Sequence, residues 1–119
     1  MILIDPAGTS VKNIVHYSQL VVNKNFQMYD YGSEKENNLH YNQTKPPVYD
    51  VRKVKLPVGL YCGGADWLAD LDDVNLLREK LPNIVEDYSV AEWDHSDLVW
   101  ASNASLVYYN RILQLMEKY

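Results

Sequence analysis

Cysteine, clustered positive charge and long apolar runs are all scarce in this chain of 119 residues. Its single cysteine, Cys62, cannot form a disulfide within the chain, and its place at the end of an apolar run predicts a buried thiol. The net charge is −5 and the lysines and arginines are scattered, so no basic stripe is available to neutralise phosphate groups. We therefore expect no nucleic-acid partner.

Membrane-spanning and targeting segments are also missing from the sequence. No apolar stretch approaches the roughly 20 residues that a membrane-spanning helix needs. Residues 1–4 are apolar but too few for the hydrophobic region of a secretory signal, so we expect no signal peptide in this chain. Repeats and low-complexity tracts are absent, and 47% hydrophobic with 23% charged residues is typical of a globular domain.

The first part of the chain predicts one helix and one long loop. A turn over residues 6–10 ends in Thr9 or Ser10, either of which can cap a helix that runs to about Val22. Residues 23–50 predict a long, mostly irregular loop, which in a compact domain often lines or covers a site. Four of its aromatic residues either form a substrate-facing wall or pin the loop to the core: Tyr29, Tyr31, Tyr41 and Tyr49.

The second part predicts strand, helix, strand and helix. A nearly continuous apolar run at 58–62 is typical of a parallel strand, and a second strand is expected at 84–90. Asp70 or Asp72 caps the helix between them, and the last helix is expected over residues 97–118.

The predicted fold class is therefore α/β, with an incomplete parallel sheet. We interpret residues 1–119 as a single partial domain, in which residues 1–50 form the helix and loop and residues 51–119 carry the strands. Two parallel strands leave unpaired backbone groups on both outer edges, so we expect the native sheet to contain strands that this chain does not supply.

Asp66 and His95 each follow a predicted strand. In open α/β sheets, side chains just beyond the carboxyl ends of parallel strands converge, so we expect these two to meet. Gly63 and Gly64 permit a sharp exit from the first strand. A carboxylate that holds one imidazole nitrogen allows the other nitrogen to remove a proton from a nucleophile. The pattern alone is equally compatible with a helix cap and a surface residue.

Five other aspartates compete for the role of the acid. All fit helix capping or solvated loops better, because they lie further from a strand end or beside His95 itself: Asp70, Asp72, Asp73, Asp94 and Asp97. In α/β hydrolases the nucleophile precedes both partners, in the order Ser, acid, His. No Gly-x-Ser-x-Gly occurs here, so the order indicates the C-terminal end of a hydrolase. A cysteine hydrolase that uses Cys62 is a weaker alternative.

Four stretches carry a resemblance to a known family, and together they reach across nearly the whole chain. They are residues 6–11, 40–47, 63–70 and 95–100. In these stretches the sequence resembles the C-terminal third of the acid lipase family, α/β hydrolases that include gastric lipase and lysosomal acid lipase. The resemblance implies that Asp66 and His95 are the acid and base of a Ser-His-Asp triad.

The same resemblance implies the substrate and the setting. Family members hydrolyse carboxylic ester bonds of neutral lipids, triacylglycerol or cholesteryl ester, at a lipid–water interface, and we expect neither a cofactor nor a metal ion. They are secreted or lysosomal and N-glycosylated, which implies a glycan on Asn42 in Asn42-Gln43-Thr44. The second sequon, at Asn103, has no family support. We interpret the remaining histidines and the tryptophans as packing or loop-fixing residues: His16, His40, Trp67, Trp93 and Trp100.

The family's nucleophile elbow and main oxyanion-hole loop lie upstream of the residues present here. The residues before Pro6 depart from the family pattern, which predicts an alternative start or a truncated gene. We therefore expect the chain alone to be inactive as an ester hydrolase. The alternative interpretation is a non-catalytic truncated product or a lipid- or protein-binding module.

Overall fold

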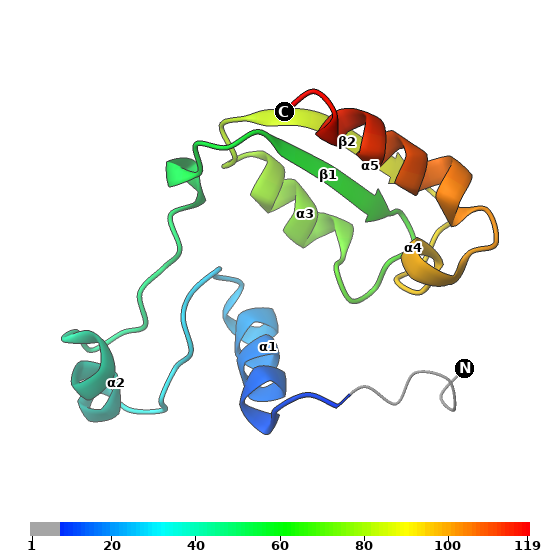
Figure 1. Ribbon diagram of the computed structural model, residues 1–119. Coiled ribbons are helices and arrows are strands. Elements are labelled where there is room, and N and C mark those ends of the chain that lie inside the picture. The colour runs from blue at the N-terminus through cyan, green and yellow to red at the C-terminus, as the bar shows by residue number, and fades with distance from the viewer. Residues whose placement is uncertain (1–7) are drawn as a thin grey trace. The chain divides into compact units, whose positions relative to one another are not determined.

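The computed structural model describes residues 8–119 and divides into two compact units, which meet in sequence between Asp50 and Val51 (Figure 1). The predicted turn over residues 6–10 lies partly outside the described residues. That the chain forms one partial domain stays a prediction. No helix in the described part of the chain has the length and apolar character needed to cross a membrane.

Helix α1 (Val11–Asn23) confirms the first predicted helix. The Ser10 hydroxyl accepts a hydrogen bond from the backbone N–H of Asn13 at 3.1 Å, as an N-cap should. The Gln19 side chain exchanges two hydrogen bonds with the backbone of Asp30, at 2.8 and 2.9 Å. These bonds attach the segment after α1 to one side of the helix.

The prediction of a mostly irregular loop over residues 23–50 missed helix α2 (Glu34–Tyr41). This helix is polar on nearly all sides, so it has no apolar stripe to reveal it. The Ser33 hydroxyl caps its first turn by accepting from the N–H of Glu36 at 3.2 Å. The buried Asn37 side chain ties it to the loop by donating to Asp30 and to the Thr44 carbonyl. Caps and a buried amide therefore hold α2, in place of apolar packing.

The tyrosines of this first unit contact one another and the backbone. The ring of Tyr31 stacks on His40 at 3.6 Å between centroids and meets Tyr29 edge-on at 5.0 Å. The Tyr41 hydroxyl donates to the Tyr29 carbonyl at 2.9 Å, and Tyr49 packs on a phenylalanine ring at 4.8 Å. These contacts join residues of the same segment to one another, so the choice between a substrate-facing wall and a loop pinned to the core stays a prediction.

The second unit is built on strands β1 (Val58–Gly63) and β2 (Ile84–Val90), which pair in parallel as predicted. Helix α3 (Leu71–Arg78) connects them, and the Asp70 carboxylate caps it by accepting from the N–H of Asp73 at 3.0 Å. A short 3-10 turn, η1 (Val51–Lys53), precedes β1.

The expectation of one helix over residues 97–118 is wrong. Helix α4 (Asp97–Trp100) stops where Ala101 turns to extended backbone, and the chain resumes as the π-helix η2 (Ser105–Tyr109) and α5 (Asn110–Met116). The residues between α4 and η2 are small or polar, so no apolar stripe carries the helix through them.

Alternate residues of β2 face two different helices. Arg78 of α3 forms a two-pronged ion pair with Asp87, at 2.6 and 2.7 Å, and also reaches Ser89. Arg111 of α5 instead pairs with Glu86 and lies over the Tyr88 ring at 4.2 Å. Because successive strand residues point to opposite faces, α3 and α5 cover opposite faces of the sheet.

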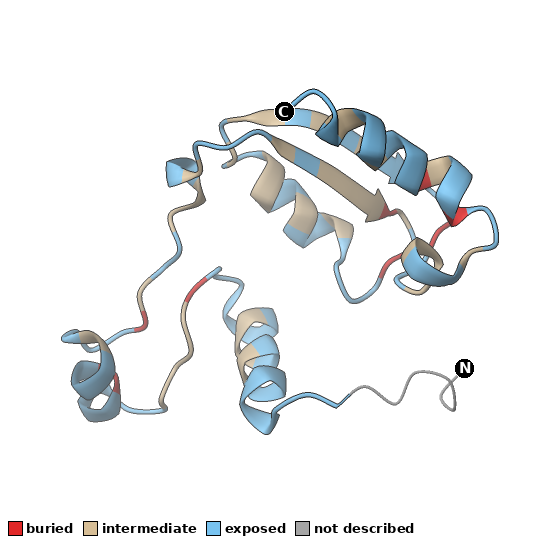
Figure 2. Cartoon of the chain, viewed as in Figure 1, coloured by how far each residue is buried: buried red, intermediate tan, exposed pale blue. Residues whose placement is uncertain are grey.

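Buried residues are few, as Figure 2 shows. Among the described residues, the buried hydrophobic side chains are Trp93, Ala104 and Tyr108, which form one cluster in the second unit. This cluster lies at the ends of the two strands, because Tyr108 bonds the Cys62 carbonyl of β1 and Trp93 belongs to the loop between β2 and His95.

Candidate active site

The Asp66 loop leaves β1 in close contact with the chain that follows β2. The N–H of Gly64 donates to the Val90 carbonyl at 2.8 Å, and the N–H of Ala65 donates to the Trp93 carbonyl at 3.0 Å. A Cβ atom on Gly63 would overlap the Trp93 carbonyl oxygen. The chain turns sharply here, as predicted, with the N–H of Asp66 donating to the Gly63 carbonyl at 3.4 Å. Gly63 and Gly64 both have φ outside the positive region, so they contribute their small size, which permits the close approach, and not a left-handed backbone.

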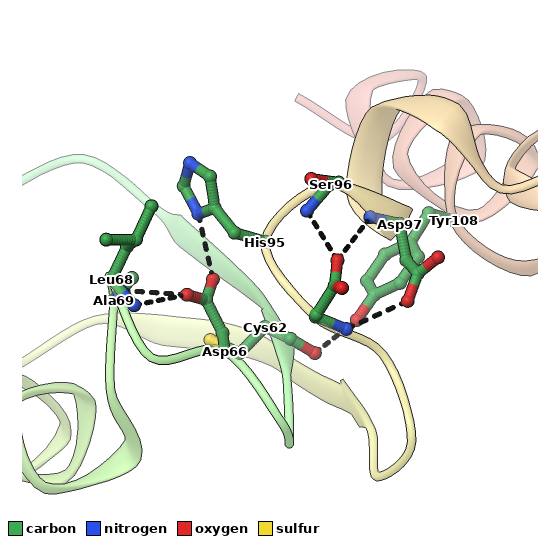
Figure 3. Close-up of polar contacts among 9 residues, drawn as sticks. Cys62, Asp66, Leu68, Ala69, His95, Ser96, Asp97 and Tyr108 are labelled. Carbon is green, nitrogen blue, oxygen red and sulfur yellow. Dashed lines mark hydrogen bonds and ion pairs between the residues drawn. The ribbon is translucent and has the colours of Figure 1, made fainter. Parts of the chain in front are cut away.

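The Asp66 side chain is buried, with 2% of its surface exposed, and both of its oxygens accept hydrogen bonds (Figure 3). Oδ1 accepts from the backbone N–H of Leu68 at 2.8 Å and of Ala69 at 2.9 Å. Oδ2 lies 3.0 Å from Nδ1 of His95. The two backbone amides therefore aim the second oxygen at the imidazole.

Burial alone would raise the pKa of the Asp66 carboxyl group. The hydrogen bonds from the Ala69 amide, from His95 and from the Leu68 amide outweigh burial, so the pKa is held below the ordinary value of 3.8 for an aspartate. The side chain is thus a carboxylate at neutral pH, as an acid that orients an imidazole must be.

His95 stands on a short turn that its neighbours brace. The Asp94 carboxylate accepts hydrogen bonds from the N–H of Ser96 at 2.7 Å and from the N–H of Asp97 at 3.1 Å. The Asp97 carboxylate in turn accepts from the N–H of Asp94 at 2.9 Å. The His95 side chain is 57% exposed. Figure 3 shows its second ring nitrogen turned away from Asp66.

This geometry can support base chemistry. With Nδ1–H donating to the Asp66 carboxylate, the neutral ring is held in the tautomer whose Nε2 carries a free lone pair. That nitrogen can take a proton from a group on the exposed side. The carboxylate then stabilises the imidazolium that results.

The competing residues serve other roles. Within the described chain, Asp66 is the carboxylate that bonds the His95 ring, whereas Asp70 caps α3, and Asp94 and Asp97 brace the turn. Two further competitors are exposed in the first turn of α3: Asp72 and Asp73.

Cys62 is half-buried, and its surroundings do not favour a nucleophilic thiolate. Burial raises the pKa of its thiol, which disfavours the reactive thiolate. The described residues hold no group of three or more side chains suited to a metal ion.

The other residues singled out from the sequence are scattered. Asn42 is exposed at the C-cap of α2, and Asn103 is exposed before η2. Trp93 packs as expected, and the His16 ring bonds the Gln27 carbonyl at 2.8 Å. Two tryptophans are exposed in the described chain, Trp67 at 90% and Trp100 at 52%, which contradicts packing and leaves their loop-fixing role a prediction.

Sequence reasoning missed three contributors to the site. The amides of Leu68 and Ala69 carry no side-chain signature, although an Asp followed by a turn is a known source of such bonds. Tyr108 lies beneath both loops but is distant from them in sequence. Only its place on the apolar side of the last helical segment could have indicated burial.

Three lipases are similar to this chain over nearly all of its residues, whereas no family model matches it. The chain is 46% identical to Homo sapiens lysosomal acid lipase/cholesteryl ester hydrolase and 45% identical to the Rattus norvegicus protein of the same name. It is 41% identical to Homo sapiens gastric triacylglycerol lipase. Each comparison covers 114 residues, 96% of this chain but only 29% of the lipase. The chain therefore spans less than a third of the length of these relatives.

Proposed function

Because this chain is a homologue of the lysosomal acid and gastric lipases, we propose that it supplies the acid and base of a Ser-His-Asp triad that hydrolyses carboxylic esters. The observation that carries the proposal is the 3.0 Å contact between Nδ1 of His95 and the buried Asp66 carboxylate. In this proposal the chain is the C-terminal portion of an α/β-hydrolase domain. The nucleophilic serine and the oxyanion hole belong to the remainder of that domain.

The proposed reaction assigns each proton. Neutral His95 accepts the serine proton at Nε2 as the serine oxygen attacks the ester carbonyl, and the imidazolium then protonates the departing alcohol. His95 next takes a proton from water, which attacks the acyl-serine, and returns that proton to the serine as the fatty acid leaves. Asp66 stays ionised throughout and stabilises the imidazolium.

The relatives' names support the substrate class. They describe a cholesteryl ester hydrolase and a triacylglycerol lipase, so we propose neutral lipid esters at a lipid–water interface. The word lysosomal in one name supports a lysosomal or secreted setting for this protein. Asn42, which is exposed at a helix end, is the proposed site of an N-linked glycan in that setting.

The test joins this chain to the N-terminal portion of a homologous lipase and measures hydrolysis of an activated ester and of triacylglycerol. Asp66→Asn should lower kcat by about 10⁴-fold, because an amide selects the wrong imidazole tautomer. His95→Ala should lower kcat by about 10⁶-fold, because the serine then loses its base. Asp72→Asn, which changes an exposed carboxylate on α3, is the matched control and should leave kcat unchanged.

The result that defeats the proposal is an Asp66→Asn or His95→Ala chain that folds and hydrolyses esters at the rate of the unsubstituted chain. Folding is checked by circular dichroism, so a loss of rate can be separated from a loss of structure.

A further inference from the structure

Tyr108 lies where both strands of the sheet end. Its side chain is 1% exposed, and its hydroxyl donates to the carbonyl of Cys62, four residues before Asp66 (Figure 3). Burial raises the pKa of the Tyr108 phenol, and the backbone of Val90, the last residue of β2, opposes that rise. The hydroxyl is thus a protonated donor placed between the ends of β1 and β2.

The ring of Tyr108 supports the loop that leads to His95. Its centroid lies 4.9 Å from that of Trp93, which is itself buried and precedes His95 by two residues. The Trp93 carbonyl accepts the N–H of Ala65, the neighbour of Asp66. One side chain therefore contacts the strand that carries the acid and the loop that carries the base.

The position of Tyr108 in the fold makes this double contact possible. It belongs to the π-helix η2, whose widened turn is uncommon and is found frequently at functional sites. The rings of Tyr61 and Tyr88, one from each strand, meet Tyr108 edge-on at 5.8 and 5.5 Å. These aromatic contacts fix the ring, so the direction of its hydroxyl is set by packing.

We propose that Tyr108 is a positioning residue for the Asp66–His95 pair, because its hydroxyl fixes the end of β1 while its ring supports the Trp93 segment. The hydrogen bond and ring contacts of Tyr108 go to Cys62, Trp93 and the strand tyrosines, so it acts through the two loops. The inference rests on the proposed function, since the pair matters only if the two residues act as acid and base.

The test is proton NMR of the 119-residue chain labelled with ¹⁵N at histidine. An Nδ1–H that donates to a carboxylate exchanges slowly with water, and the His95 signal is identified by its loss in Asp66→Asn. Tyr108→Phe removes the hydroxyl and keeps the ring. The His95 Nδ1–H should then exchange about tenfold faster, the scale of one lost hydrogen bond.

Tyr61→Phe is the matched control, because it removes a hydroxyl from β1 and keeps the ring that meets Tyr108 edge-on. In Tyr61→Phe the His95 Nδ1–H should exchange at the same rate as in the unsubstituted chain. A folded Tyr108→Phe chain with unchanged exchange overturns the inference. If Tyr108→Phe does not fold, Trp93→Phe is measured instead, because it alters the ring that Tyr108 contacts. Faster exchange of the His95 Nδ1–H in that variant supports the inference, and an unchanged rate overturns it. The NMR experiment does not measure ester hydrolysis, so its result does not depend on the hydrolysis assay. A failed hydrolysis assay would count against the proposed function and not against the role of Tyr108.

Discussion

At the scale of single residues, the two oxygens of the Asp66 carboxylate have different partners. Oδ1 of Asp66 is held by the amides of Leu68 and Ala69, and Oδ2 faces His95. A carboxylate that bonded the imidazole alone could rotate away from it. The backbone bonds remove that freedom, so the orientation of His95 depends on the Leu68 and Ala69 turn as much as on Asp66 itself.

The lowered pKa of Asp66 predicts a pH dependence of stability. A carboxyl group whose pKa is lower in the folded than in the unfolded chain contributes stability above its unfolded value and loses it as pH falls through the folded value. At neutral pH the unsubstituted chain should therefore have a larger free energy of unfolding than Asp66→Asn. The difference between the two chains should shrink as the pH falls below 3.8. Urea unfolding at several pH values measures it. A difference that grew on acidification would contradict the assigned direction.

Gly63→Ala should disrupt the site through its backbone. The new Cβ would overlap the Trp93 carbonyl oxygen, which is held by a hydrogen bond and cannot move cheaply. We expect a loss of about 3 kcal/mol in the free energy of unfolding, the upper range for overpacking. Gly59→Ala in the same strand meets only side-chain atoms, of Leu115 at 2.9 Å and of the Tyr61 ring at 3.0 Å, which can shift more easily than backbone, so it should cost less. Equal losses in denaturant unfolding would refute this reading.

The meeting of Asp66 with His95 could be predicted from sequence because it follows from topology. Each residue stands just beyond a strand, and parallel strands bring their carboxyl ends to one edge. The Leu68 and Ala69 amides and Tyr108 could not be predicted in the same way. Their roles depend on the local path of a turn and on a contact between residues 46 apart, which no short-range pattern encodes.

At the scale of elements, the strands were predictable and two helical regions were not. The runs at β1 and β2 are apolar or alternating over their whole length, so packing and local preference agree. Helix α2 lacks an apolar stripe, and its only sequence signal is a serine followed three residues later by glutamate, Ser33 and Glu36. The last helix was predicted as continuous because its apolar spacing spans the break at Ala101.

Helix α3 provides a test at this scale, because one side chain caps it. Asp70→Ala leaves the N–H of Asp73 without its acceptor and should lower the free energy of unfolding by about 1 kcal/mol. Asp70→Asn retains an oxygen at the same place and should recover most of the loss. Thermal unfolding of the two variants compares them directly. Equal destabilisation by both would show that charge, and not the cap, accounts for the effect.

At the scale of the whole molecule, apolar surface is more abundant than core. The buried hydrophobic residues of the described chain form one small cluster, whereas helices in both units expose valine, leucine or isoleucine side chains. The sheet has two strands, and each has a neighbour on one side only within the described residues. Exposed apolar faces and open strand edges both favour association with further chain.

This imbalance predicts how the 119-residue chain behaves by itself. With so small a core, its free energy of unfolding should fall below about 5 kcal/mol, the lower end for native domains. It should bind a dye that reports exposed apolar surface, because side chains such as Val11, Leu106 and Met116 are 68–80% exposed. Joined to the N-terminal portion of a homologous lipase, the same residues should bind less dye and unfold at higher urea concentration, since added strands and helices would cover them. A chain that is monomeric by sedimentation, binds no dye and unfolds sharply would instead show that the small core suffices, and the expectation of missing strands would fail.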